Sequence, residues 1–363
     1  MKKSNKTFKT IIATILMFSM ISCISGNYMV TTKIDGDGAF LREIYAKGDS
    51  AFLSGDMSHN PYMFNLDSNW RVTLLDTADK YAEYNVKISK TVGAVDEFVV
   101  VLKCDEDVRP LAAPVETFEK RFRWFYSYYT FKTVYPCISE KILVAIDEYM
   151  NKDEQKLWFQ GDISAYAGMT GMGLKDRLDD MEEKFVEWFF RNVYEACFNG
   201  IMAFEKLSAD SPYVALLPAA KDIVFQILVE KNVKKDVTDI NYISTLLDTY
   251  FNTTHFSDSY KKNAQKINKM CEEYLPENLF SKRIEYKLIV PGKLVNANAP
   301  SISGDTLTWK VMAINLIPDD YELTATSRSV NIWAFVVVFF LIVLSVYCLR
   351  KLKTKRVRIT KLW

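Results

Sequence analysis

The stretch IWAFVVVFFLIVLSVYCL, at residues 332–349, contains 18 consecutive residues without a charge. As an α-helix it would be about 27 Å long, which matches the hydrocarbon core of a bilayer. Trp333 and Tyr347 lie near its two ends, where amphipathic aromatic rings prefer the membrane interface. Such a helix would have no polar face, so a buried core helix is the weaker interpretation. We predict a transmembrane helix at residues 330–349.

The segment that follows this helix is strongly basic. Residues 350–363 contain seven Lys or Arg residues and no acidic residue. The positive-inside rule places such a tail in the cytoplasm and the body of the chain outside. We therefore expect a single-pass protein of the cytoplasmic (inner) membrane, with its body on the extracytoplasmic (periplasmic) side.

The N-terminus predicts the same orientation independently. Four lysines and no acidic residue accompany an apolar run of about 13 residues that leads to Cys23, which is the pattern of a secretory signal peptide over residues 1–22. Met20-Ile21-Ser22-Cys23 resembles a bacterial lipobox, in which the Cys thiol receives a lipid. We predict that Cys23 is a lipid anchor. An ordinary signal peptide, or an uncleaved one with Cys23 incidental, is the alternative.

The body between these ends has the composition of a folded protein. The chain is 49% hydrophobic and 25% charged, whereas a disordered chain would contain fewer apolar residues and more net charge. Without the 11 Lys and Arg residues of the two ends, 35 basic residues remain against 45 acidic ones. An acidic body argues against nucleic-acid binding, because a phosphate backbone requires a basic surface.

Short apolar runs and turn signals predict strands in the first part of the body, residues 23–137. Asp35-Gly36-Asp37-Gly38 lies between two strand-like runs, which favours a hairpin. The same residues resemble the start of a calcium loop, but Ala39 stands where a further ligand is needed. We therefore predict a turn. The expected strands of this part are residues 28–34, 39–46, 70–75, 84–89 and 98–103.

The run FRWFYSYYTFKTVY, at residues 122–135, is rich in aromatic residues on both alternating faces. A strand that is apolar on both faces is usually central in a sheet and covered on both sides. We predict one such strand here, with its rings packed in the core. The alternative is that these aromatic rings form a platform that binds a ligand.

The apolar period becomes helical in residues 138–276. The glycine-rich segment 168–173 precedes the longest apolar stripe, but no strand comes before it and no Lys-Ser/Thr follows, so we predict a connection rather than a phosphate loop. The expected helices are residues 152–161, 173–207, 219–230, 240–250 and 259–274. The β pattern returns in residues 277–329, with expected strands at 283–290, 306–312 and 321–326. The predicted fold class is α+β: a β-rich domain with a large helical insertion, plus one C-terminal transmembrane helix and a basic tail.

Three segments of the second β part carry a resemblance: VPGKLVNAN at residues 290–298, SGDTLTW at 303–309 and ELTATS at 322–327. Together they resemble the terminal β segment of LppM-type bacterial envelope lipoproteins. In that family a lipidated Cys, a β-rich domain and one C-terminal transmembrane helix follow in the same order. The resemblance implies a tethered extracytoplasmic module that recognises envelope components, and it supplies no catalytic residues. Independently, we expect Trp309 to pack in the core.

The sequence contains little that indicates catalysis. Its two histidines, His59 and His255, lie in no recognised motif, and no G-x-S-x-G or H-E-x-x-H occurs. We therefore predict no catalytic, metal-binding or cofactor-binding residue. Either disulfides or buried free thiols are expected among the four cysteines of the body, and four cysteines allow three pairings. These cysteines are Cys104, Cys137, Cys197 and Cys271.

The hypothesis that combines these features is a non-catalytic binding or assembly module of the bacterial cell envelope. Its expected partners are the lipid bilayer and another envelope protein or a glycan. The alternative is a carboxylate-dependent hydrolase of an envelope polymer, because a pair of acidic residues suffices for glycoside hydrolysis. A subunit that contacts a membrane complex through its transmembrane helix is a third reading, although this helix contains few small residues.

Overall fold

The computed structural model describes residues 27–62, 64–75, 83–94, 113–207, 211–230, 239–272 and 283–360. Within these residues the chain is a mixed α/β protein with two β-sheets and a long apolar C-terminal helix. The strand predicted at residues 98–103 lies outside the described residues.

The larger sheet has seven strands in the order β3-β4-β2-β1-β7-β10-β9. The predicted hairpin at its centre is confirmed, because β1 and β2 pair antiparallel and the Gly38 amide donates to the Asp35 carbonyl at 3.0 Å. β1 and β7 are parallel neighbours, although several helices separate them in the chain. The strands are β1 (Asn27–Ile34), β2 (Phe40–Ala46), β3 (Arg71–Leu74), β4 (Val86–Val92), β7 (Arg283–Ile289), β9 (Ser301–Ser303) and β10 (Thr306–Met312).

The smaller sheet has the order β5-β6-β11-β8. Its strands are β5 (Val115–Arg123), β6 (Tyr126–Tyr135), β8 (Lys293–Ala297) and β11 (Tyr321–Val330). The prediction of one strand over residues 122–135 is wrong at its start. Trp124 and Phe125 form a two-residue turn, and Arg123 pairs with Tyr126 across it. Of the two strands that share the aromatic run, only β6 is central, and the first residues of the run belong to the end of β5, at the sheet edge.

The two sheets pack face to face around a common core. Phe40 of β2 meets Phe118 of β5 with ring centroids 5.0 Å apart, and Phe131 of β6 stacks on Tyr286 of β7 at 6.4 Å. Trp309 is buried, as predicted, and its indole N–H donates to the Asn298 side-chain oxygen at 3.0 Å. Inward-facing aliphatic residues complete this core: Ile44, Val86, Ile88, Leu288, Leu307, Leu323 and Ala325.

All five predicted helices are present between β6 and β7. They are α3 (Lys152–Gln160), α4 (Gly171–Lys206), α5 (Leu217–Glu230), α6 (Ile240–Phe251) and α7 (His255–Glu272). Side-chain caps explain where three of them begin: Asn151, Thr170 and Asp239 each accept a backbone N–H of the first turn. The predicted glycine-rich connection is shorter than expected, because the glycines that follow Thr170 belong to α4.

Helices α4 and α7 approach each other closely at a glycine. A Cβ placed on Gly200 would lie 2.7 Å from the backbone nitrogen of Cys271. Real Cβ atoms do not approach backbone so closely, so only glycine permits this contact. Cys197 lies one turn before Gly200, and its carbonyl accepts the Cys271 thiol at 3.4 Å. Helices α4 and α7 therefore pack tightly against each other, and we call the residues from α3 to α7 the helical block.

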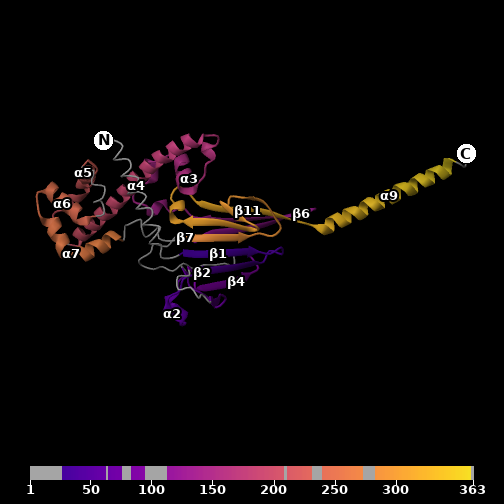
Figure 1. Cartoon of the computed structure of the whole chain (residues 1–363), viewed down its shortest axis with the longest axis horizontal. Helices are drawn as coiled ribbons and strands as arrows, with labels where there is room; N and C mark the ends of the chain where they lie inside the picture. The colour runs from indigo at the N-terminus through magenta and orange to yellow at the C-terminus, as the bar shows by residue number, and fades with distance from the viewer. Residues whose placement is uncertain are drawn as a thin grey trace.

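The molecule is elongated, and its helices and strands occupy different parts of its length (Figure 1). Helices α5, α6 and α7 lie at one end, the strands lie in the middle, and α9 (Ile332–Thr360) projects from the other end. Its segment Ile332–Lys351 has a mean hydropathy of 2.8 and is almost entirely exposed, so it is long and apolar enough to cross a membrane. Asn315 lies in a short 3-10 helix, Ala313–Leu316, between β10 and β11, and its amide donates to the Phe159 carbonyl of α3 at 2.5 Å.

Candidate functional site

The predicted site residue, Cys23, lies outside the described residues, and so does Cys104. Cys137, Cys197 and Cys271 are free thiols. The thiol of Cys271 interacts with buried Cys197, and this hydrogen bond together with burial raises the pKa of Cys271. In the part of the chain that the structure describes, no three His, Cys, Asp or Glu residues are grouped as a metal site requires.

A buried ion pair connects the two sheets. Arg42 of β2 contacts the Glu116 carboxylate of β5 at 2.7 Å, and the two side chains are only 9% and 8% exposed. Tyr286 and Thr133 also donate their hydroxyls to Glu116, at 3.2 and 3.3 Å. The Arg42 Nε donates to the Thr32 hydroxyl at 3.1 Å. We call these five residues the Arg42–Glu116 centre.

The electrostatics of this centre favour a structural role. Burial is the largest single influence on Arg42 and lowers its pKa. The charges of Glu116, Tyr286 and Tyr135 and the hydrogen bond to Glu116 together outweigh burial, so the net pKa is raised and the guanidinium stays charged. Burial, followed by the charge of Glu116, raises the pKa of Tyr286, which therefore stays neutral. The five side chains use their hydrogen bonds and charges on one another inside the protein. The centre therefore joins the two sheets and presents no reactive group to a substrate.

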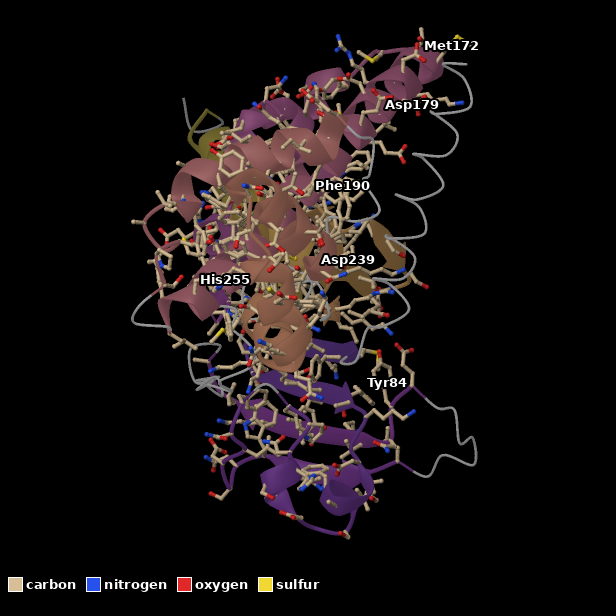
Figure 2. All side chains as sticks on the ribbon, turned by 90° about the vertical axis from the view of Figure 1, so that its left-hand side faces the viewer. Tyr84, Met172, Asp179, Phe190, Asp239 and His255 are labelled. Atoms are coloured by element: carbon tan, nitrogen blue, oxygen red, sulfur yellow. The ribbon has the colours of Figure 1, made fainter. Side chains whose placement is uncertain are left out.

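A second polar cluster lies in the helical block. The Nε2 of His255 is 3.0 Å from the Glu205 carboxylate, and the Ser211 hydroxyl donates to the same carboxylate at 2.6 Å. A catalytic triad requires the serine to donate to the histidine, whereas here both bond the glutamate. Figure 2 shows His255 among the helices, so this cluster belongs to the helical block. The other histidine, His59, pairs at the surface with Asp49 at 2.8 Å.

The third candidate is the junction between the β-sheets and α9. Val330, the last residue of β11, pairs with Tyr126 at the start of β6, and α9 begins two residues later. Asn331 is the only residue between strand and helix. Its backbone N–H donates to the Phe125 carbonyl at 2.8 Å, and its side-chain amide donates to the Trp124 carbonyl at 2.9 Å. The junction is thus held by hydrogen bonds rather than by a flexible linker.

Aromatic rings surround this junction. Phe122, Trp124 and Phe125, which we call the hairpin tip, lie at the end of the β5–β6 hairpin. Phe122 stacks on Trp333 with centroids 6.0 Å apart and planes 7° apart, and Trp124 meets Trp333 edge-on at 5.5 Å. Phe125 contacts Phe335 with centroids 4.7 Å apart. The tip therefore lies beside the first turn of α9.

Sequence reasoning missed this site because the turn lacks its usual residues. Two-residue hairpin turns favour Gly or Asn at positions with positive φ, and Trp124 occupies such a position with a φ of 30°. Trp124 is far from the predicted transmembrane helix in the sequence, and no periodic pattern links the two. Only the pairing of β6 with β11 brings Trp124 to Trp333.

Comparisons with protein-family models, curated proteins and solved structures gave no match to this chain.

Proposed function

We propose that this protein is a membrane-tethered extracytoplasmic module that holds its helical block away from the bilayer for non-catalytic binding or assembly in the bacterial cell envelope. The observation that carries the proposal is the junction. One residue, Asn331, separates β11 from α9, so the body cannot swing freely on its anchor. A rigid mount suits a protein that presents a surface at a fixed height.

The height follows from the strand length. β11 contains ten residues and spans about 33 Å at about 3.3 Å per residue. Its first residue, Tyr321, lies toward α3 and its last, Val330, toward α9. Because α5, α6 and α7 lie at the end opposite to α9 (Figure 1), they would be the part farthest from the membrane. This is the surface that we assign to an envelope partner, either a protein or a glycan.

We also propose that the helical block is an insertion in one β-rich domain. The parallel pairing of β1 with β7, with Asn27 opposite Arg283, supports this division because the chain leaves and re-enters the same sheet around the helices. The segments that resemble LppM-type lipoproteins contribute to β8, β10 and β11. Membership of that family and the cytoplasmic position of the basic tail belong to the same proposal. The lipid on Cys23 is an alternative anchor: Asn27 lies at the end of β1 that faces the helices, and four extended residues reach about 14 Å, so a lipid on Cys23 would bring that end of the sheet to the bilayer.

The hydrolase alternative receives no support from the carboxylates of the two polar clusters described above. Glu116 is bound to Arg42 and Glu205 to His255 and Ser211. Both are turned to partners inside the protein, and a glycosidase requires a carboxylate pair that flanks its substrate.

The proposed location and orientation are tested on right-side-out membrane vesicles from cells that express the full chain with an epitope after residue 363. We expect external protease to remove the body and leave the epitope protected. Mass spectrometry of the mature protein, compared with Cys23→Ala, decides between the two anchors. A lipid on Cys23 would place the helix-facing end of the sheets at the bilayer and contradict the proposed height. A protected body with a digested epitope would contradict the proposed orientation.

The binding role is tested with a photo-crosslinking amino acid at Ile223 of α5, in intact cells. Val72, on the edge strand β3, is the matched control because the two residues are 41% and 39% exposed. We expect a discrete adduct with one envelope component from position 223 and none from position 72. Equal adduct patterns from both positions would contradict a specific helical surface.

A further inference from the structure

The hairpin tip exposes large apolar rings that a water-soluble surface would not favour. Phe122 is 53% and Trp124 is 46% exposed, even after their contacts with Trp333. Each ring could bury about 150–250 Å² of surface. An exposed apolar cluster of this kind marks an interaction site.

Backbone strain at the tip is a second, independent observation. Trp124 has a φ of 30°, a conformation that favours glycine because a Cβ is crowded there. A side chain in such a conformation costs about 1–3 kcal/mol and persists where function requires it. A bulky ring at this position is therefore unexplained by the needs of the turn.

The position of the tip identifies what covers it. Phe125 packs against Phe335, the fourth residue of α9, and Trp124 packs against Trp333, the second residue. At 1.5 Å per residue, the tip lies within about 5 Å of the start of the apolar helix. Trp and Phe at this depth match the interface between head groups and acyl chains. Arg121 and Arg123, both exposed, flank the rings and suit the phosphate layer just outside.

We propose that the hairpin tip inserts into the interfacial layer of the bilayer and forms a second membrane contact beside α9. The occupant is lipid, because the tip is continuous with the transmembrane helix through three ring contacts. The inference rests on α9 spanning the membrane, as proposed above. Together, α9 and the tip would fix the tilt of the β-sheets on the membrane, which a single helix cannot do.

Tryptophan quenching in lipid nanodiscs tests the inference with the full chain. Emission is recorded with acyl chains brominated near the head group and, separately, with aqueous iodide. The variants are Trp124→Phe at the tip, Trp333→Phe at the start of α9 and Trp158→Phe on α3 as the matched control. Phe keeps an apolar ring at each position, and circular dichroism verifies the fold.

We expect Trp124→Phe and Trp333→Phe each to cause a loss of lipid-quenched emission, and Trp158→Phe to cause none. If Trp333→Phe reduces lipid quenching and Trp124→Phe reduces only iodide quenching, the tip is in water and the inference is overturned while the anchor stands. If Trp124→Phe changes neither, protein such as a second copy covers the tip, which also overturns it. No effect from Trp333→Phe would overturn the proposed anchoring and the tip contact with it.

Discussion

The two ends of the β5–β6 hairpin have opposite chemistry. At its root, Glu116 and Thr133 are buried against the larger sheet and bonded to Arg42 and Tyr286. At its tip, the side chains of Phe122 and Trp124 are exposed, and the backbone of Trp124 is strained in the turn. The root buries polar side chains and provides each with a hydrogen-bond or ion-pair partner, whereas the tip exposes apolar side chains at the surface. The difference indicates that the root serves the fold and that the tip serves a contact outside the fold.

The largest expected effect is at the root. Glu116→Ala would leave the buried Arg42 guanidinium without its carboxylate, so we expect a loss of about 3–5 kcal/mol in the free energy of unfolding. The measurement is denaturant unfolding of the full chain in detergent micelles, followed by circular dichroism.

Glu119→Ala is the matched control for Glu116→Ala, because it lies on the same strand and also pairs with an arginine. The Glu119–Arg121 pair is exposed, at 3.0 Å, and exposed pairs contribute about 0–1 kcal/mol. Equal losses from the two variants would remove the contrast between root and tip.

The root should also make the protein sensitive to high pH. Burial is the main cause that raises the pKa of both Tyr135 and Tyr286 above the ordinary value of 10.0, and the charge of Glu116 adds to it. Above pH 10 the unfolded chain loses these protons while the folded protein retains them. Stability is therefore complete below pH 10 and falls by up to about 1.4 kcal/mol per pH unit and tyrosine above it.

Absorbance at 295 nm and unfolding curves between pH 9 and 12 measure this effect. Tyr135→Phe keeps the shape of the ring and removes one ionisable group, so its stability should fall less steeply with pH than that of the wild type. Full titration of every tyrosine in the folded protein near pH 10 would contradict the prediction.

The same contrast explains what the sequence could predict. The helices have regular apolar stripes and recognisable caps such as Asn151 and Asp239, so all five were predicted, with boundaries that differ by a few residues. The long apolar helix α9 and the β1–β2 turn carry equally local signals. These features depend on neighbours in the chain, which a single sequence displays.

Features that depend on distant residues were not predictable. The Arg42–Glu116 pair joins β2 to β5, and the contact of Trp124 with Trp333 depends on the pairing of β6 with β11. The β5–β6 turn was read as strand because Trp and Phe are typical strand residues. A turn that breaks its local rule is expected at a functional position.

Asn331→Ala tests whether the tip is held to the anchor. The variant loses the hydrogen bond to the Trp124 carbonyl and the one that Asn331 accepts from Ser127 at 3.0 Å. We expect a loss of about 1–2 kcal/mol in stability, since each bond contributes about 0.5–1.5 kcal/mol. Ser345→Ala is the control, because its hydroxyl only bonds the Leu341 carbonyl within α9. An equal, small effect of both variants would show that Asn331 does not fix the junction.

The smallest effect, and the one that separates folding from function most sharply, is Trp124→Gly. Glycine adopts a positive φ without strain, and this gain exceeds the entropy that glycine loses on folding. The variant also loses the edge-on contact of Trp124 with Trp333, which contributes about 0.5–1.5 kcal/mol. We therefore expect the stability in detergent to stay within about 1 kcal/mol of the wild type. In nanodiscs the same variant should lose the lipid-quenched emission of the tip and let the β-sheets tilt on the membrane, which distance measurements between spin labels on β3 and lipid head groups would detect. Glu116→Ala cannot give this result, because it leaves the buried Arg42 guanidinium without its carboxylate. If Trp124→Gly instead destabilises the protein in detergent by several kcal/mol, the ring is needed for the fold, and its exposure at the membrane edge has no separate role.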